Sequence, residues 1–405
     1  MGPRILILSW EYPPIVEGGL ARHVRKLSEE LVRQGVEVHV LTRGGREMPT
    51  VQMRAGVVVH RVAEEQTPRD LDAFVAWVEG MNAHMLAAGR QLGKRLGFDV
   101  VHGHDWLVAG AAAGLAERLR CPYLTTIHAT EYGRHQGWVG KHPQSYIHGI
   151  ETWMAGRADR VITCSHYMRG HVADVFDIAE RRVSVIPNGI DPEDLQPVGD
   201  LDELRARFAR PDERLVLLVG RLVYEKGFQL ALDAMGGRDG VLRRAGRVRF
   251  LVAGSGTHEA ELRRHARRLG LMEHGTFLGW IGDDVLHSLY RIADLCVVPS
   301  IYEPFGLVAL EAMASGCPCI VADTGGLREV VPNEDVGLRF RSRDPRSLAE
   351  MMERVLTDDE LRDRLVAEAS DHVLRFDWAD VARQTAQVYD ELAVAPAPRT
   401  ARRGA

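Results

Sequence analysis

The chain has few cysteines, no long apolar run and no strong excess of one charge. Five scattered cysteines, an odd number, argue against a disulfide framework. The first apolar run, Ile5–Leu8, is broken at once by Trp10–Pro14, and no run approaches the roughly 20 residues of a membrane span. A net charge of −5 gives no basic field for nucleic acid. We therefore expect a cytoplasmic protein without a nucleic-acid partner, and peripheral membrane contact stays open.

The composition and the order of apolar segments predict two α/β domains. With 405 residues, 45% of them hydrophobic and 26% charged, the chain is too long for one ordinary core and apolar enough for two. Short apolar segments alternate with helical patterns, as in parallel-sheet domains. The expected strands are Ile5–Leu8, Val36–Leu41, Val57–Val62, Val100–His102, Tyr123–Ile127, Val161–Cys164, Val183–Ile186, Leu215–Val219, Val248–Ala253, Thr276–Leu278, Leu295–Val298 and Cys319–Ala322. The expected helices include Leu20–Gln34, Ala73–Leu96, Phe228–Arg244, His258–Leu269, Asp284–Ala293, Leu307–Ser315, Pro345–Thr357 and Trp378–Leu392.

A cluster of turn-forming residues at Pro187–Pro192 predicts the domain boundary. We expect a first domain over residues 1–192, a second over 193–375, a helix over 376–392 and a disordered tail over 393–405. Ligands of open α/β sheets bind at the carboxyl ends of the strands. Loops at these ends of both domains are therefore expected to converge on one cleft.

The stretch Ser300–Glu311 is the most informative in the chain. Glu303 precedes a helix that is expected to begin after a glycine, and Glu311 lies one to two turns inside this helix. Backbone N–H groups at a helix start attract phosphate. The segment therefore offers a phosphate cradle, a carboxylate for a sugar and an acceptor for ligand hydroxyls, a combination that suits a nucleotide-sugar. The residues of the expected cradle are Gly306, Leu307 and Val308.

Loops after other predicted strands of the second half add a cationic pair and a wall for a base. Arg221 and Lys226 are five residues apart in one loop, so both can bind one diphosphate, Arg through two bonds and Lys as a point charge. Gly254 can admit phosphate or base. Trp280 and Ile281 can present an apolar wall to a nucleobase, although ordinary packing explains Trp280 equally well.

In the first half, three loops carry candidate residues. Gly18 and Gly19 directly precede a helix, where glycines allow close approach of phosphate, although a tight turn needs them as well. His104, Asp105 and His128 follow strand ends. A lone histidine is more often structural than catalytic, but these positions face the predicted cleft.

These motifs together resemble those of retaining GT-B glycosyltransferases of family 4. The residues that carry the resemblance are Gly18-Gly19, His128, Arg221 with Lys226, and Glu303 with Glu311. Trp10–Pro14, His104-Asp105-Trp106 and the segment around Asn188 further resemble the glycogen-synthase-like branch of α-(1→4)-glucosyltransferases, which make glycogen or methylglucose polysaccharides. The resemblance extends from Ile5 to about Tyr389 and implies two Rossmann-like domains, with the final helix crossing back to the first.

The resemblance also implies a role for each matching residue. Arg221 and Lys226 would stabilise the departing diphosphate, Glu303 would contact the donor sugar and Glu311 the ribose hydroxyls. His128 would meet the donor sugar. The implied donor is ADP-glucose or UDP-glucose, and the implied acceptor is an α-glucan or an oligosaccharide. One loop departs from the pattern: this chain has Val16-Glu17-Gly18-Gly19 where glycogen synthases carry Lys-x-Gly-Gly, and an acidic residue there cannot supply the extra cation.

No metal is required in this scheme, since the two cations neutralise the leaving group. Asp70-Leu71-Asp72 is the one Asp-x-Asp candidate, and we interpret it as charge at a helix start. The family's favoured account of retention is front-face attack, in which the departing phosphate oxygen takes the acceptor's proton.

Three other functions remain open from the sequence. A transferase with a lipid or small-molecule acceptor would share every donor motif. A nucleotide-sugar epimerase would convert donor without acceptor. A non-catalytic nucleotide-sugar binder would bind without turnover. The donor base, the acceptor, the linkage and the oligomeric state are not determined by the sequence.

Overall fold

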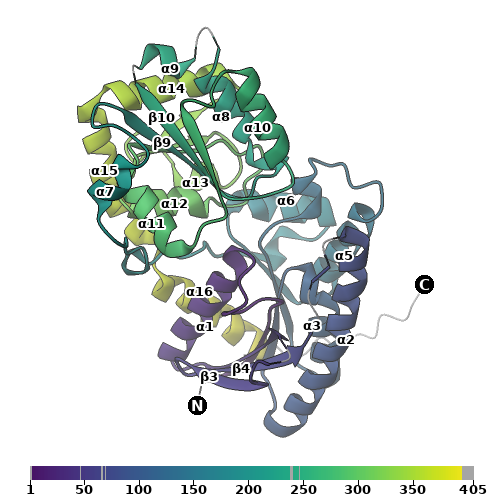
Figure 1. Ribbon diagram of the computed structural model, residues 1–405. Coiled ribbons are helices and arrows are strands. Elements are labelled where there is room, and N and C mark those ends of the chain that lie inside the picture. The colour runs from purple at the N-terminus through teal and green to yellow at the C-terminus, as the bar shows by residue number, and fades with distance from the viewer. Residues whose placement is uncertain are drawn as a thin grey trace. The chain divides into compact units, whose positions relative to one another are not determined.

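The computed structural model describes residues 2–394 except 46, 65–66, 69, 238–239 and 246, and it divides the chain into two compact units (Figure 1). Unit 1 contains the described residues up to Gly189 and those from Trp378 onward, and unit 2 contains Ile190–Asp377. The last helix reaches Val394, so Ala393 and Val394 are helical and not part of a tail. Between Trp378 and Pro396 the sequence contains no proline that would end the helix earlier. The rest of the expected tail, 395–405, lies outside the described residues.

Unit 1 is built on an eight-stranded sheet in the order β3-β4-β2-β1-β5-β6-β7-β8. All neighbouring strands pair in parallel except β3 with β4. The strands are β1 Arg4–Leu8, β2 Glu37–Gly44, β3 Val51–Arg54, β4 Val57–Ala63, β5 Val100–His104, β6 Tyr123–Ile127, β7 Arg160–Thr163 and β8 Val183–Val185. The helices are α1 Gly19–Arg33, α2 Leu71–Leu96, α3 Ala109–Leu119, α4 Glu131–Arg134, α5 Gln144–Arg157, α6 His166–Phe176 and α16 Trp378–Val394.

Unit 2 is built on a six-stranded parallel sheet in the order β11-β10-β9-β12-β13-β14. Its strands are β9 Arg214–Val219, β10 Val248–Ala253, β11 Gly275–Gly279, β12 Leu295–Val298, β13 Cys319–Ala322 and β14 Leu338–Phe340. Its helices are α7 Leu201–Ala206, α8 Phe228–Met235, α9 Val241–Arg244, α10 Glu259–Arg268, α11 Asp283–Ile292, α12 Leu307–Ala314, α13 Leu327–Val330, α14 Pro345–Thr357 and α15 Asp359–Val373. None of the helices in the described part of the chain is long and apolar enough to cross a bilayer.

The C-terminal helix α16 belongs to the core of unit 1. It packs on α1, as Figure 1 shows, and buries Val381, Val388 and Tyr389 among the apolar side chains of α1 and the sheet. The Tyr389 hydroxyl lies 2.8 Å from Nδ1 of His102 in β5. The predicted return of this helix to the first half of the chain is therefore confirmed.

Several elements differ from the expectation, among them strand β14 and helices α7 and α13, which were not expected. The helix expected over Phe228–Arg244 ends at Met235, since Gly236 and Gly237 follow and Gly237 has a positive φ of 78°. Strand β3 was not expected, and it pairs with β4 through a two-residue turn at Ala55 and Gly56, both with positive φ. Helix α15 was not expected either, because Asp358 alone separates it from α14.

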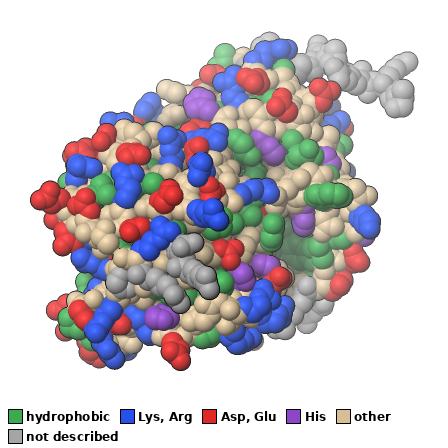
Figure 2. Space-filling model, turned by 90° about the horizontal axis from the view of Figure 1, so that it is seen from above, with side chains coloured by type: hydrophobic (Ala, Val, Ile, Leu, Met, Phe, Trp, Pro, Cys, Tyr) green, Lys and Arg blue, Asp and Glu red, His purple; other side chains and the backbone are tan. Residues whose placement is uncertain are grey.

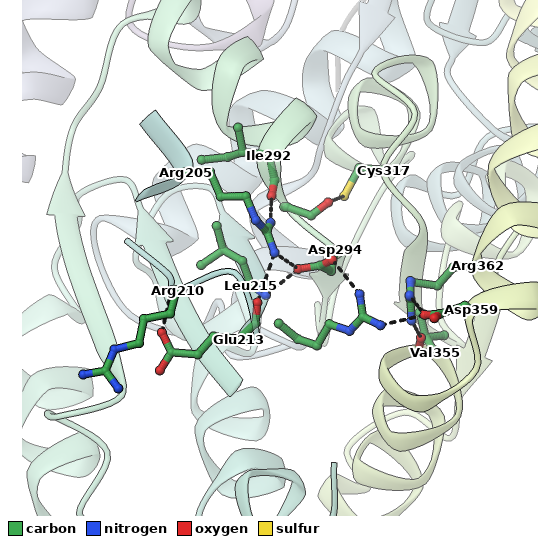
Figure 3. Close-up of polar contacts among 12 residues, drawn as sticks. Arg205, Arg210, Glu213, Leu215, Ile292, Asp294, Cys317, Val355, Asp359 and Arg362 are labelled. Carbon is green, nitrogen blue, oxygen red and sulfur yellow. Dashed lines mark hydrogen bonds and ion pairs between the residues drawn. The ribbon is translucent and has the colours of Figure 1, made fainter. Parts of the chain in front are cut away.

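A partly buried polar network fixes the strand starts in the middle of the unit 2 sheet (Figure 3). The Asp294 carboxylate, just ahead of β12, accepts from the backbone N–H of Leu215 at 2.7 Å and from Nη2 of Arg205 at 2.8 Å. Arg205 also donates to the carbonyl of Ile292. Arg214 lies 3.3 Å from Asp294 and continues the network to Asp359. One carboxylate therefore ties β9 and β12 to α7 and α15.

Replacing this carboxylate should destabilise unit 2. In Asp294→Asn two guanidinium groups lose a charged partner, so we expect the free energy of unfolding to fall by about 2–3 kcal/mol. Urea unfolding followed by circular dichroism measures this. Asp212→Asn is the matched control, because Asp212 pairs with Arg247 on the exposed surface and such pairs contribute about 1 kcal/mol or less. Equal effects of the two substitutions would contradict the structural role of Asp294.

Candidate active site

Two neighbouring strands of unit 2 carry an ion pair at their carboxyl ends. Lys226 lies in the loop after β9, and Glu303 lies in the loop after β12. Lys226 Nζ is 2.7 Å from Glu303 Oε2, and the Ser300 hydroxyl donates to the same oxygen at 3.0 Å. Glu303 is buried and Lys226 is partly exposed. The structure thus joins two of the predicted site residues directly and leaves the ammonium accessible to a ligand.

The second predicted carboxylate lies inside the helix that follows this loop. Glu311 is in the second turn of α12 and is only 9% exposed, and the hydroxyl of Tyr290 donates to its Oε2 at 3.0 Å. The helix begins after Gly306, whose φ is 123°. A Cβ on Gly306 would lie 2.6 Å from Leu327 Cδ2, so this turn requires glycine. At the start of α12, which includes Leu307 and Val308, the N-cap residue Gly306 makes no side-chain cap hydrogen bond.

The remaining candidates of unit 2 occupy loops at the same edge of the sheet. Arg221 is exposed directly after β9, while Trp280, 78% exposed, and Ile281 directly follow β11. Gly254 follows β10 with a φ of 134°, and a Cβ there would lie 1.9 Å from the carbonyl oxygen of Gly220. Close packing of two loops therefore accounts for this glycine without any ligand.

In unit 1, the loop between β1 and α1 is organised by a carboxylate that the sequence analysis had not singled out. Glu11 is buried and accepts from the backbone N–H of Glu17 and, at 3.2 Å, from that of Gly18. Burial raises its pKa to about 7, against the opposing effect of the two N–H groups. Glu11 thus holds the backbone just ahead of Gly19, where α1 starts.

Glu17, the acidic residue of the segment that departs from the family pattern, forms part of the same loop. Its carboxylate pairs with Arg43 at 2.6 Å, and that guanidinium lies 4.8 Å from the ring centroid of Trp10. A cation thus stands beside the acidic residue, supplied by the end of β2 instead of by the glycine loop. Such a stacked ion pair gives the loop a fixed shape.

The predicted residues after β5 and β6 meet one another. His104 Nδ1 is 3.1 Å from His128 Nε2, and the carboxylate of Asp105 accepts from the backbone N–H of His128 at 2.8 Å. Asn188 is buried and hydrogen-bonds to the side chain of His23 in the second turn of α1. The His23 ring centroid lies 4.6 Å from that of His128 and 5.6 Å from that of His104. Three of the predicted residues, His104, His128 and Asn188, therefore lie beside His23, and Asp105 joins them through the backbone of His128.

His23 is a member of the site that the sequence analysis missed. It occupies the buried face of α1, together with Ala21, Val24 and Leu27. The available signal was a single polar residue on an otherwise apolar helical stripe, one turn after the glycine pair. For Glu11 there was no such signal, because nothing in its local spacing shows that it binds Glu17 and Gly18.

Burial keeps the histidine rings uncharged at neutral pH. It lowers the pKa of His128 to about 4 and those of His23 and His104 well below the ordinary value, and repulsion among the neighbouring rings lowers the latter two further. For Asp105, burial raises the pKa to about 6, while N–H donors from His128 and Ala129 oppose the rise. The three histidine rings therefore offer polar atoms without positive charge.

The Asp-x-Asp candidate has a structural role. Asp70 is the N-cap of α2 and accepts from the backbone N–H of Ala73 at 2.9 Å. Asp72, in the first turn, lies 3.1 Å from His142. The interpretation as charge at a helix start is confirmed.

The sheet of unit 2 carries an ion pair and a helix start at the carboxyl ends of its strands. The sheet of unit 1 carries a hydrogen-bonded polar cluster at the carboxyl ends of its own strands. These features define a nucleotide-sugar-dependent glycosyltransferase. The comparisons agree. Residues 17–194 match the family described as Glycosyltransferase Family 4, and residues 200–372 match Glycosyl transferases group 1. The chain belongs to glycosyltransferase family 4, and the predicted GT-B fold is confirmed.

Several characterised proteins resemble this chain along its length. The chain is 38% identical to a glycogen synthase of Mycobacterium tuberculosis (strain ATCC 25618 / H37Rv) over 400 residues, which cover 95% of this chain and 94% of that protein. It is 35% identical to a D-inositol 3-phosphate glycosyltransferase of Frankia alni, with 92% and 94% covered. Among solved structures, sucrose-phosphate synthase from Thermosynechococcus elongatus matches with a TM-score of 0.80 and 26% identity, covering 97% of this chain and 100% of that one.

The raised pKa of Glu11 predicts a pH dependence of stability. Between the ordinary pKa of 4.5 and about 7, the folded chain binds a proton at Glu11 that the unfolded chain has released. The stabilisation by this carboxyl is thus complete below pH 4.5 and is lost as the pH rises through 7. We expect the unfolding free energy of the wild type, relative to Glu11→Gln, to fall by up to about 3 kcal/mol from pH 4.5 to 8.

Urea titrations of both proteins across this pH range measure the difference. Glu180→Gln is the control, because Glu180 lies on the exposed surface and should give a constant difference. A constant difference for Glu11→Gln would show that this carboxyl is ionised in the folded chain throughout.

Proposed function

We propose that this protein is a retaining hexosyltransferase that moves glucose from ADP-glucose or UDP-glucose to an α-glucan or oligosaccharide. The observation that carries the proposal is the contact of Lys226 with Glu303 beside the start of α12. A cation for diphosphate and a carboxylate for sugar hydroxyls are thereby fixed side by side. The 38% identity to a glycogen synthase supports glucose and a glucan.

In this proposal unit 2 binds the donor. The N–H groups at the start of α12 and the cations of Arg221 and Lys226 bind the diphosphate, because helix starts and preorganised cations stabilise anions. Glu311, next to Tyr290, accepts from the ribose hydroxyls, and Glu303 contacts the sugar. Trp280 and Ile281 provide the wall for the base, and Gly254 shapes the adjoining loop.

Unit 1 contributes uncharged polar groups. Nε2 of His128 already contacts His104, so the other ring nitrogen, Nδ1, is the atom that would contact sugar hydroxyls. His104 and Asn188, the latter through His23, set the position of that ring. Gly18 and Gly19 leave the loop open for phosphate: a Cβ at Gly18 would meet nothing within 4 Å.

The chemical step that we propose is a front-face substitution. The bond from the anomeric carbon to the diphosphate oxygen breaks, and a bond to the acceptor oxygen forms on the same face. The acceptor's proton passes to the departing phosphate oxygen. Arg221 and Lys226 neutralise the charge that develops there, so no metal is required.

A second candidate differs only in its acceptor. The 35% identity to a D-inositol 3-phosphate glycosyltransferase favours transfer to a small phosphorylated acceptor. In unit 1, Arg43 stands beside the glycine loop and could bind such a phosphate, although Glu17 pairs with it here. The donor half of the site is the same for both candidates.

A panel of donors and acceptors tests the proposal. We expect nucleoside diphosphate release from ADP-glucose or UDP-glucose that depends on added maltooligosaccharide, with an α-linked product by NMR. GDP-mannose and UDP-N-acetylglucosamine serve as donor controls. Release that requires D-inositol 3-phosphate would favour the second candidate. Conversion of the donor without any acceptor would instead indicate an epimerase and contradict transfer.

Lys226→Ala should lower turnover by about two orders of magnitude or more, on the scale of one lost charge-stabilising group. Lys94→Ala is the control, because Lys94 is exposed in the last turn of α2. Glu303→Gln and the double variant complete a cycle. Since the two side chains are 2.7 Å apart, we expect the losses to be far from additive. Initial rates measure this, with circular dichroism as the folding check; wild-type turnover of Lys226→Ala would remove Lys226 from the mechanism.

A further inference from the structure

The histidine cluster of unit 1 contains more ring nitrogens than its hydrogen bonds use. His23, His104 and His128 each offer one ring nitrogen, and these three atoms lie within 4.8 Å of one another. His23 and His104 are buried, and His128 is partly exposed. Nδ1 of His23 is a buried atom for which the described residues provide no hydrogen-bond partner. Buried polar atoms without partners are rare and call for an explanation.

The fourth histidine of the cluster provides the contrast. His102 lies next to His104, with ring centroids 4.4 Å apart. Both of its nitrogens are used, one with the Tyr389 hydroxyl at 2.8 Å and the other with the Thr126 hydroxyl at 2.7 Å. A histidine that only supports the fold is satisfied in this way. His23 is not, because its buried Nδ1 has no partner among the described residues.

We propose that His23, His104 and His128 bind one divalent transition-metal ion of the Zn²⁺ type. Two nitrogens that bind one tetrahedral zinc at 2.0–2.1 Å are about 3.3 Å apart. The 3.1 Å between His104 Nδ1 and His128 Nε2 is already close to this value, so small ring rotations allow a metal to replace the proton between them. His23 needs a further shift to become the third ligand.

The chemistry of the ligands selects the metal. Three uncharged imidazoles suit Zn²⁺, Co²⁺ or Ni²⁺ and not Mg²⁺ or Ca²⁺, which prefer oxygen. Asp105, the nearest carboxylate, is held by the backbone N–H of His128. The partly exposed side of His128 leaves a route for the ion and a position for water or another ligand.

The ion would inhibit the transferase. This consequence rests on the proposed function, because a metal on His128 removes the ring that faces the sugar. The binding itself does not depend on the function. An experiment can therefore contradict the inhibition and leave the metal binding intact.

Metal binding is tested on the full chain without a histidine tag. We expect equilibrium dialysis to give one Zn²⁺ per chain, and Co²⁺ to give the intense visible absorption of a four- or five-coordinate site. His23→Gln and His104→Gln should each weaken binding about 100-fold or more, since one of three ligands is lost. His84→Gln, which removes an exposed histidine on α2, should bind as the wild type does.

Two outcomes would overturn the site. One is equal binding by wild type and His23→Gln. The other is the weak absorption of octahedral Co²⁺ in the wild type, a result that does not depend on any variant folding. For inhibition, we expect Zn²⁺ to lower turnover at the concentrations that load the site, EDTA to restore it, and His84→Gln to behave as the wild type. Full turnover with zinc bound would contradict the inhibitory role while leaving the metal site intact.

Discussion

Lys226 and Glu303 meet because they follow neighbouring strands of a parallel sheet. β9 and β12 end at the same edge, so the loops that leave them are adjacent although the residues are 77 positions apart. Asp294 fixes the starts of the same two strands. The ion pair at one end of the strands thus depends on a polar network at the other end. Any change in the register of β12 would separate the cation from its carboxylate.

In unit 1, too, residues meet because they follow neighbouring parallel strands, but there hydrogen bonds join them and not an ion pair. β5 and β6 are neighbours, which brings His104 to His128 and Asp105 to the backbone of His128. Beneath them His102 links β5 to β6 and to α16. The last helix of the chain therefore supports the histidines from below, and this explains why a C-terminal segment is part of the first unit.

Much of this arrangement follows from local patterns in the sequence. Apolar runs such as Tyr123–Ile127 predict central strands, and loops after such strands predict which residues reach the site edge. Short or irregular elements are harder to predict. β3 is exposed and short, and its turn uses Ala55, a residue not favoured at positive φ. α15 merges with α14 in any helical pattern, since only Asp358 marks the change of direction.

Among the candidate site residues, too, some can be predicted from local sequence patterns and others cannot. Lys226, Glu303 and His128 stand in recognisable motifs, and the sequence suffices to find them. Glu11 and His23 act through contacts that arise only on folding: a carboxylate that turns back to two N–H groups, and a ring that reaches Asn188 from another part of the chain. No spacing rule encodes such pairs. Their pKa values, too, follow from burial, which local sequence does not determine.

Electrostatics distinguishes the candidate residues of unit 1 from those of unit 2. On the face shown in Figure 2, basic and acidic side chains are interspersed, so attraction of a charged ligand depends on local groups more than on a broad field.

The edge of unit 2 keeps its charge, with Lys226 partly exposed and Glu303 beside it. At the edge of unit 1, burial leaves the histidine rings neutral. A diphosphate is stabilised by fixed cations, whereas sugar hydroxyls need donors and acceptors without net charge. Under the proposed function, this contrast assigns the donor diphosphate to unit 2 and the sugar hydroxyls to unit 1. Neutral nitrogens that can accept from a hydroxyl can also bind a metal ion, which is why the proposed zinc site uses the same rings as the proposed sugar contact.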